Sequence, residues 1–125
     1  MKHLLNDVLD FHRACDIPIA SDLSVPGQAR ADLRIELIEE EVNRELLPAM
    51  RAGDLIEIAD AMADSIYVIV GAAIEYGIPL DHVWAAVQGA NMAQGRSYHW
   101  QSQATRGWKD FEARWVATAG HPCRA

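Results

Sequence analysis

Residues 53–77 read GDLIEIADAMADSIYVIVGAAIEYG, and this stretch decides the fold. Gly53 interrupts the preceding pattern, and Asp54 is a residue type that caps the N-terminus of a helix. After Asp64 the stretch is apolar on nearly all sides, until Gly77 ends it. A helix of this kind is buried on most faces, either by its neighbours or by a partner subunit. We therefore expect one long central helix here.

Apolar residues at helical spacing also occur on both sides of this stretch. They predict three more main helices, over about residues 2–15, 29–51 and 80–93. Pro48 is expected to kink or end the second of these, and the segment 18–28, with two prolines, two serines and a glycine, is expected to be a loop. No alternation typical of β-strands reaches a useful length. The sequence therefore predicts an all-α fold, a four-helix bundle that dimerisation completes.

The charge of the chain is unevenly distributed. The 125 residues carry a formal net charge of −7. Residues 1–94 contain 6 Lys and Arg against 16 Asp and Glu, whereas residues 95–125 contain 5 against 2. We interpret residues 1–94 as one helical domain and residues 95–125 as its basic, Trp-containing tail or lid. The acidic body argues against a nucleic-acid polymer as partner, because such a partner needs a basic face.

The cysteines and the N-terminus bear on the location of the protein. Cys15 and Cys123 form neither a metal-binding spacing nor a disulfide framework. The first residues do not have the pattern of a signal peptide, and no apolar run approaches the roughly 18 residues that a membrane span needs. We therefore expect a cytoplasmic protein without a membrane partner.

Acidic residues recur on the second and third expected helices. Glu41 and Glu45 are four residues apart and share a helix face. Asp60 and Asp64 have the same spacing, and Glu57 precedes Asp60 by three residues. The short link between the two helices makes them antiparallel, so that the two acidic faces can meet.

The residues around Asp60 and Asp64 are largely small or apolar, which predicts burial of both carboxylates. Burying unpaired carboxylates is costly, and a hard divalent cation removes that cost. Ligands that are all oxygen suit Mg²⁺ or Mn²⁺, and Ca²⁺ less specifically; Mg²⁺ is the expected ion. The alternative is solvated surface charge, which is the usual state of a single acidic residue.

These residues also resemble a known family. The chain is similar to the all-α nucleoside triphosphate pyrophosphohydrolases, the superfamily of MazG, dimeric dUTPase and phosphoribosyl-ATP pyrophosphohydrolase, and most of all to its small MazG-like, phage-type members. The segments that carry the resemblance are Phe11-His12, Leu33–Val42, Gly53–Val68, Gly77-Ile78 and Asn91-Met92.

The resemblance implies a four-helix core that forms a dimer or a dimer of dimers and holds Mg²⁺ in the acidic cluster. It implies hydrolysis of a nucleoside triphosphate to a monophosphate and pyrophosphate, in a role that clears unwanted nucleotides. Glu40 and Glu41 match an adjacent glutamate pair, one a metal ligand and the other a ligand or the base that orients water. Asp64 matches a metal-binding aspartate, and Asn91 an asparagine near the substrate.

Three positions depart from the pattern of these relatives. Their third glutamate usually follows the pair by three residues, where this chain has Arg44, and Glu45 comes one residue later. Ala61 stands where they have a glutamate, so that Asp60 or Glu57 would serve instead. Gln94 replaces a lysine that follows the asparagine, which leaves neutralisation of the phosphates to Arg96, Arg106 or Lys109.

The predicted site comprises catalytic, metal-binding and substrate-binding residues. The catalytic residues are Glu40 and Glu41, the metal ligands Glu41, Glu45, Glu57, Asp60 and Asp64, and the substrate-binding residues His12, Asn91, Arg96 and Lys109. Two alternatives stay open at this point. One is a helical module that binds nucleotide and metal with little or no turnover, and the other is a structural helical dimer whose acidic residues are only solvated.

Overall fold

The computed structural model describes residues 1–94, which contain helices and no strand. The elements are α1 (Lys2–Ala14), α2 (Gln28–Ile38), a π-helix η1 (Glu39–Leu46), α3 (Leu47–Ala52), α4 (Leu55–Tyr76) and α5 (Leu80–Gln94). The all-α prediction is thereby confirmed. The predicted central helix corresponds to α4. Lys2–Gly77 forms one compact unit, and α5 belongs to a second that begins at Ile78.

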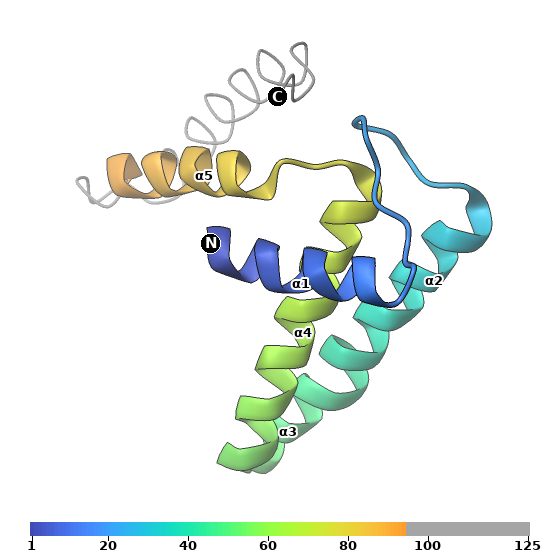
Figure 1. The fold of residues 1–125 in the computed structure, drawn as a ribbon. Helices are drawn as coiled ribbons and strands as arrows, with labels where there is room; N and C mark the ends of the chain where they lie inside the picture. The colour runs from blue at the N-terminus through green and yellow to red at the C-terminus, as the bar shows by residue number, and fades with distance from the viewer. Residues whose placement is uncertain (95–125) are drawn as a thin grey trace. The chain divides into compact units, whose positions relative to one another are not determined.

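The elements α2, η1 and α3 follow one another without a break and form a single rod (Figure 1). Pro48 was expected to kink or end this rod, but the rod continues to Ala52. The reason is its position: Pro48 lies in the first turn of α3, where a missing N–H is tolerated. The rod ends at Gly53, whose φ of 72° is left-handed and suits a residue without Cβ.

A tight turn then reverses the chain, so that α4 runs antiparallel to the rod (Figure 1). The Asp54 side chain caps α4 by accepting hydrogen bonds from the backbone N–H of Ile56 at 3.1 Å and of Glu57 at 3.2 Å. The N-cap predicted for Asp54 is thereby confirmed. The predicted antiparallel pairing of the two acidic helices is confirmed as well.

The core of the first unit lies where α4 meets the rod and α1. Its buried apolar side chains are mostly small: Val8, Ala31, Ala61, Val70, Ala73 and Ile74. Small side chains let helix backbones approach one another closely. α1 lies across α4 near the end that is opposite the α3–α4 turn (Figure 1).

Within residues 1–94, α4 is covered on one face only over residues 61–69, whereas residues 70–76 are buried or half-buried on all sides. Met62, Ile66, Tyr67 and Ile69 are each between 40% and 46% exposed. Phe11, which is 45% exposed, packs edge-on against Tyr67 with ring centroids 5.6 Å apart. The burial expected on most faces of this helix is therefore found over residues 70–76, and residues 61–69 keep one face exposed within the part of the chain that the structure describes.

The loop between α1 and α2 is anchored on the C-terminal end of α4. The backbone N–H of Ala20 donates to the carbonyl of Ile74 at 3.1 Å, and that of Ser24 donates to Tyr76 at 3.0 Å. Gly77 follows with a φ of 67°, and a Cβ at this position would lie 2.2 Å from the carbonyl oxygen of Asp22. Glycine is required here for two reasons: the positive φ disfavours other residues, and there is no room for a Cβ.

None of the helices within residues 1–94 combines the length and the apolar character that crossing a membrane requires.

Candidate metal centre

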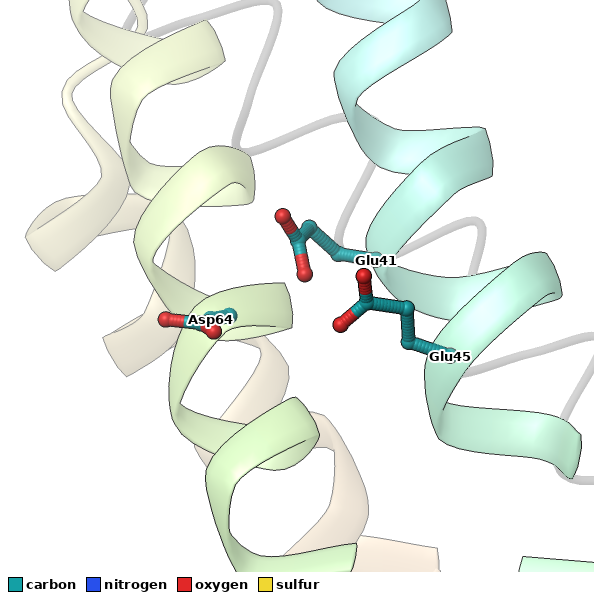
Figure 2. Close-up of side chains that lie close together, drawn as sticks. All are labelled: Glu41, Glu45 and Asp64. Carbon is teal, nitrogen blue, oxygen red and sulfur yellow. The ribbon is translucent and has the colours of Figure 1, made fainter. Parts of the chain in front are cut away.

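Three carboxylates meet where η1 faces α4. Glu41 and Glu45 come from η1 and Asp64 from α4 (Figure 2). Each contributes one oxygen to a group in which all three oxygens lie within 4.8 Å of one another. This is the only group of three or more His, Cys, Asp or Glu side chains with such proximity among the described residues. The two acidic helices predicted to face each other therefore do so through these three residues.

Glu41 lies at the centre of the electrostatic argument. Its Oε2 atom is buried and has no hydrogen-bond partner among the described residues. Burial raises the pKa of Glu41 above its usual range, and the neighbouring charges of Glu45, Asp64 and Glu40 raise it further. An ionised carboxylate is therefore disfavoured here unless a cation compensates it.

The donor set fits a hard divalent cation. Carboxylate oxygens are the ligands that Mg²⁺, Mn²⁺ and Ca²⁺ prefer, and a cation among them removes both the mutual repulsion and the unmet hydrogen-bonding capacity of Glu41. Three protein ligands leave coordination positions of Mg²⁺ for water or for phosphate oxygens. Glu41, Glu45 and Asp64 are the residues that would hold such an ion.

Comparison with known proteins agrees with this fold. Residues 8–91 match the phosphoribosyl-ATP pyrophosphohydrolase family over about two thirds of the chain. The chain belongs to this family. Its members are all-α hydrolases that act on nucleotides and generally depend on a divalent metal. The superfamily suggested by the sequence is thereby confirmed.

One curated relative is an uncharacterized protein of Acanthamoeba polyphaga mimivirus. It is 48% identical over 50 residues, which are 40% of this chain and 20% of the relative. This chain therefore matches about a fifth of the length of that relative.

Two further metal ligands predicted for this family member, Glu57 and Asp60, lie beside the three carboxylates and not among them. Both line a groove of about 410 Å³ between the lower part of the rod and α4. The other lining residues are Arg44, Glu45, Pro48, Ala49, Ala52, Asp54 and Ala61. Glu45 therefore belongs to both the carboxylate group and the groove, and the groove adjoins the candidate metal centre.

The burial predicted for Asp60 and Asp64 is wrong in the single chain, because both side chains are exposed. The buried positions of this part of α4 are Ala61 and Ser65, each one residue further along the helix. The aspartates therefore flank the buried stripe. Proximity to η1, and not depth, is what makes Asp64 a candidate ligand.

Arg44, which stands where the relatives have a glutamate, does not pair with the clustered carboxylates in the described part of the chain. Its guanidinium forms an ion pair with Glu36, which belongs to the same rod. Both side chains are more than half exposed. No ion pair of Arg44 with Glu41 or Glu45 occurs within residues 1–94. Arg44 thus leaves the carboxylate group uncompensated.

Glu40 is exposed on η1 next to Glu41 and is not one of the three clustered residues. Its charge contributes to the raised pKa of Glu41. Asn91 lies on α5, in the second compact unit, and Arg96 and Lys109 lie outside the described residues. Their predicted roles stay predictions.

His12 lies in a setting that favours a structural role over the predicted contact with substrate. Its side chain is only 1% exposed, and Nδ1 lies 3.1 Å from the carbonyl oxygen of Pro18, so that Nδ1–H donates to it. Burial lowers the pKa of His12 below 6.5, the nearby Arg34 and Arg30 lower it further, and the Pro18 hydrogen bond and Glu75 oppose this.

The sequence analysis missed a buried ionic cluster beside His12. Glu75 of α4 accepts hydrogen bonds from Arg34 and, at 2.7 Å, from Arg30, both on α2. Burial by itself raises the pKa of Glu75, but the two arginines outweigh it and the net shift is downward. The available signals were Glu75 itself, which interrupts an apolar helix, and the four-residue spacing of the two arginines.

Gly71 makes room for this cluster. A Cβ at Gly71 would lie 2.7 Å from Nη1 of Arg34 and 3.2 Å from Nε2 of His12. The cluster therefore joins α1, α2 and α4 around a glycine. Because α2 continues into η1, it also fixes where η1 lies against α4.

Proposed function

We propose that this chain is a Mg²⁺-dependent nucleoside triphosphate pyrophosphohydrolase, which converts a ribo- or deoxyribonucleoside triphosphate to the monophosphate and pyrophosphate. Mn²⁺ is the expected substitute ion. The observation that carries the proposal is the group formed by Glu41, Glu45 and Asp64, with its buried and unpartnered Glu41 oxygen. Membership in a family of nucleotide pyrophosphohydrolases supports the reaction class. A role in clearing the nucleotide pool goes with this reaction.

In the proposed reaction, a water oxygen forms a bond to the α-phosphorus and the bond to the bridging oxygen breaks. Pyrophosphate leaves, and a carboxylate accepts the proton of the water. A bound divalent ion would polarise the phosphate oxygens and offset the charge of the transition state. Glu41, Glu45 and Asp64 hold that ion, and Glu40, adjacent and exposed, orients the attacking water as general base.

Residues outside the cluster would bind the nucleotide. Asn91, Arg96 and Lys109 are proposed to contact it, with the two cations offsetting phosphate charge. The groove lined by Glu57 and Asp60 adjoins Glu45 and offers a place for part of the substrate or for a further ion.

The test is pyrophosphate release by the full-length chain with Mg²⁺ and a panel of ribo- and deoxyribonucleoside triphosphates. Glu41→Gln and Asp64→Asn each remove one ligand charge at nearly constant size. We expect each to reduce turnover by at least about 100-fold, since even residues that only support metal ligands can cost about 10–100-fold. The matched control is Glu39→Gln, an exposed glutamate of the same segment outside the cluster.

Pyrophosphate release no greater than that of Glu41→Gln would contradict the proposal. If metal and nucleotide together then raise the melting temperature without product formation, the chain is the binding module without turnover. If calorimetry finds neither Mg²⁺ nor Mn²⁺ bound, the acidic cluster is only solvated surface.

We further propose that a second copy of the chain covers the exposed apolar face of α4, giving a homodimer or a dimer of dimers. The support is the row of half-exposed Met62, Ile66 and Ile69 on a helix whose other face is buried. Sedimentation equilibrium measures the state directly. Ile66→Lys should shift it toward monomer, and a purely monomeric wild-type chain would overturn this part of the proposal.

A further inference from the structure

The π-helical segment η1 interrupts a rod that is α-helical on both sides. Its hydrogen bonds reach back five residues: at its end, the backbone N–H of Leu47 donates to the carbonyl of Val42. A π turn holds more residues than an α turn, and such turns occur frequently at functional sites. The rod therefore contains a surplus of residues between α2 and α3, at the segment that carries Glu41 and Glu45.

The wider turn changes where Glu45 lies relative to Glu41. An α-helix has 3.6 residues per turn, so a residue four positions on lies past one full turn and a residue three positions on falls short of it. In the wider π turn, a residue four positions on also falls short of one full turn. Glu45 thus lies on the side of Glu41 that the third following residue would occupy in an α-helix. There its oxygen is within 4.8 Å of those of Glu41 and Asp64.

The pair formed by Glu36 and Arg44 is an independent sign of the same displacement. These residues are eight positions apart, yet their side chains form an ion pair along the rod. In an α-helix, eight residues exceed two full turns, whereas the widened segment brings them closer to two turns and onto one side. The pair spans the π segment and keeps Arg44 engaged outside the carboxylate group.

We propose that η1 is a positioning device in which the π turn absorbs one surplus residue, so that Glu41, Glu45 and Asp64 converge while α2 and α3 both keep their packing on α4. The role of Glu45 as a ligand rests on the metal-dependent function proposed above. The claim that the π turn keeps α2 and α3 in phase with α4 does not rest on that function. The device accounts for Glu45 standing one residue later than the resemblance expects.

The test is removal of the surplus residue. Asn43 is exposed and makes no side-chain hydrogen bond with the described residues, so its deletion removes little besides backbone. We expect the deletion to turn η1 into α-helix, with α2 and α3 still in phase with α4. The melting temperature of the full-length chain should change by only a few degrees, and circular dichroism should show unchanged helix content.

Metal titration then tests the position of Glu45. Mn²⁺ affinity, measured by calorimetry or electron paramagnetic resonance, should stay within about threefold of wild type after deletion of Asn43. Glu45→Gln should lower that affinity by the same factor in the full-length and in the deleted chain. An equal effect of Glu45→Gln in both chains shows that Glu45 keeps its place at the ion, which a merely structural role of η1 would not require.

The matched control is deletion of Ile69, which is 45% exposed and lies within α4, a helix without a π turn. That deletion must rotate one half of α4 against the other and should abolish cooperative unfolding. An Asn43 deletion as damaging as this control, or a stable Asn43 deletion in which Glu45→Gln no longer affects Mn²⁺ affinity, overturns the proposal. If wild type binds no Mn²⁺, the proposed function fails, and the melting temperatures still decide whether a surplus residue is present.

Discussion

Arg34 on α2 and Glu75 on α4 form an ion pair in which the side chains are only 7% and 1% exposed. The two residues are 41 positions apart in the chain, so the pair fixes the rod against α4. Since α2 continues into η1, the same contact fixes the segment that carries Glu41 and Glu45 relative to Asp64. The position of the candidate metal centre thus depends on a contact that lies outside it.

Breaking this pair should destabilise the protein strongly. Glu75→Gln keeps the size of the side chain but leaves the buried Arg34 cation without a counter-charge, for which we expect a loss of about 3–5 kcal/mol in the free energy of unfolding. Urea denaturation measures it. Arg30→Ala serves as the comparison, because Arg30 contacts the same carboxylate but is 37% exposed and should cost less. Equal losses in the two variants would contradict this ranking.

The buried His12 should make the protein sensitive to acid. Its pKa lies below 6.5 in the folded state, so the unfolded chain binds its proton first as the pH falls. Stability attributable to His12 is therefore full above pH 6.5 and is lost as the pH falls from 6.5 toward the lowered pKa. His12→Asn, which retains a donor toward Pro18, should flatten the stability profile between pH 7.5 and 5.

The control for this profile is His3→Asn, which changes an exposed histidine on the same helix. It should leave the profile of wild type unchanged. The groups that face His12 are Arg34 and Arg30, which oppose its protonation, and Glu75, which favours it. A His12→Asn profile as steep as that of wild type would show that another group causes the acid sensitivity.

Removing the charge of Glu41 should stabilise the metal-free protein and abolish its response to metal. Because the folded-state pKa of Glu41 is raised, its ionisation costs stability as the pH rises through that pKa. Glu41→Gln should therefore raise the melting temperature of the metal-free chain at pH 7.5 by about 2 °C. Mn²⁺ should raise it in wild type but not in the variant.

Protons and metal compete for the same carboxylate, so the stabilisation by Mn²⁺ in wild type should also shrink as the pH falls from 7.5 to 5. Glu39→Gln is the control in both series and should behave as wild type. A Glu41→Gln chain that is less stable without metal would mean that the neighbouring carboxylates do not repel Glu41 as inferred.

Gly77 and Gly53 separate conformational strain from steric overlap. Both have positive φ, 67° and 72°, but a Cβ at Gly53 meets nothing within 4 Å, whereas at Gly77 it would lie 2.2 Å from the Asp22 carbonyl oxygen. Gly53→Ala should cost roughly 1–2 kcal/mol through strain alone. Gly77→Ala must also displace the loop before α2 and should cost at least about 3 kcal/mol. Denaturant midpoints compare the two, and a smaller loss at Gly77 would contradict the contact.

Local signals in the sequence were sufficient for the helices of residues 1–94 and for their class. Asp54 can cap a helix through its own side chain, and Gly53 and Gly77 end helices through their own freedom of φ. These effects involve neighbours a few residues away, so the order of residues determines them. The pairing of the two acidic helices followed as well, since a link of two residues permits only an antiparallel return.

The burial of individual side chains, and the side of each helix that is covered, could not be predicted from the sequence in the same way. The small neighbours of Asp60 and Asp64 predicted burial, yet Ala61 and Ser65 occupy the buried face, since the side of a helix that is covered depends on what packs there. The buried pair of Arg34 and Glu75 brings together residues that no local pattern connects. His12 changes from a candidate contact to a buried residue for the same reason.

The composition of the candidate metal centre illustrates both sides of this division. The sequence by itself determined that Glu41, Glu45 and Asp64 lie on facing helices, because spacing and a short turn dictate it. Only the tertiary structure decided that these three converge while Glu57 and Asp60 line the adjacent groove. The physical reason is the π turn: it places Glu45 on the side of Glu41 that the third following residue would occupy in an α-helix, and packing along the whole rod, fixed by contacts as distant as Arg34 with Glu75, holds that phase.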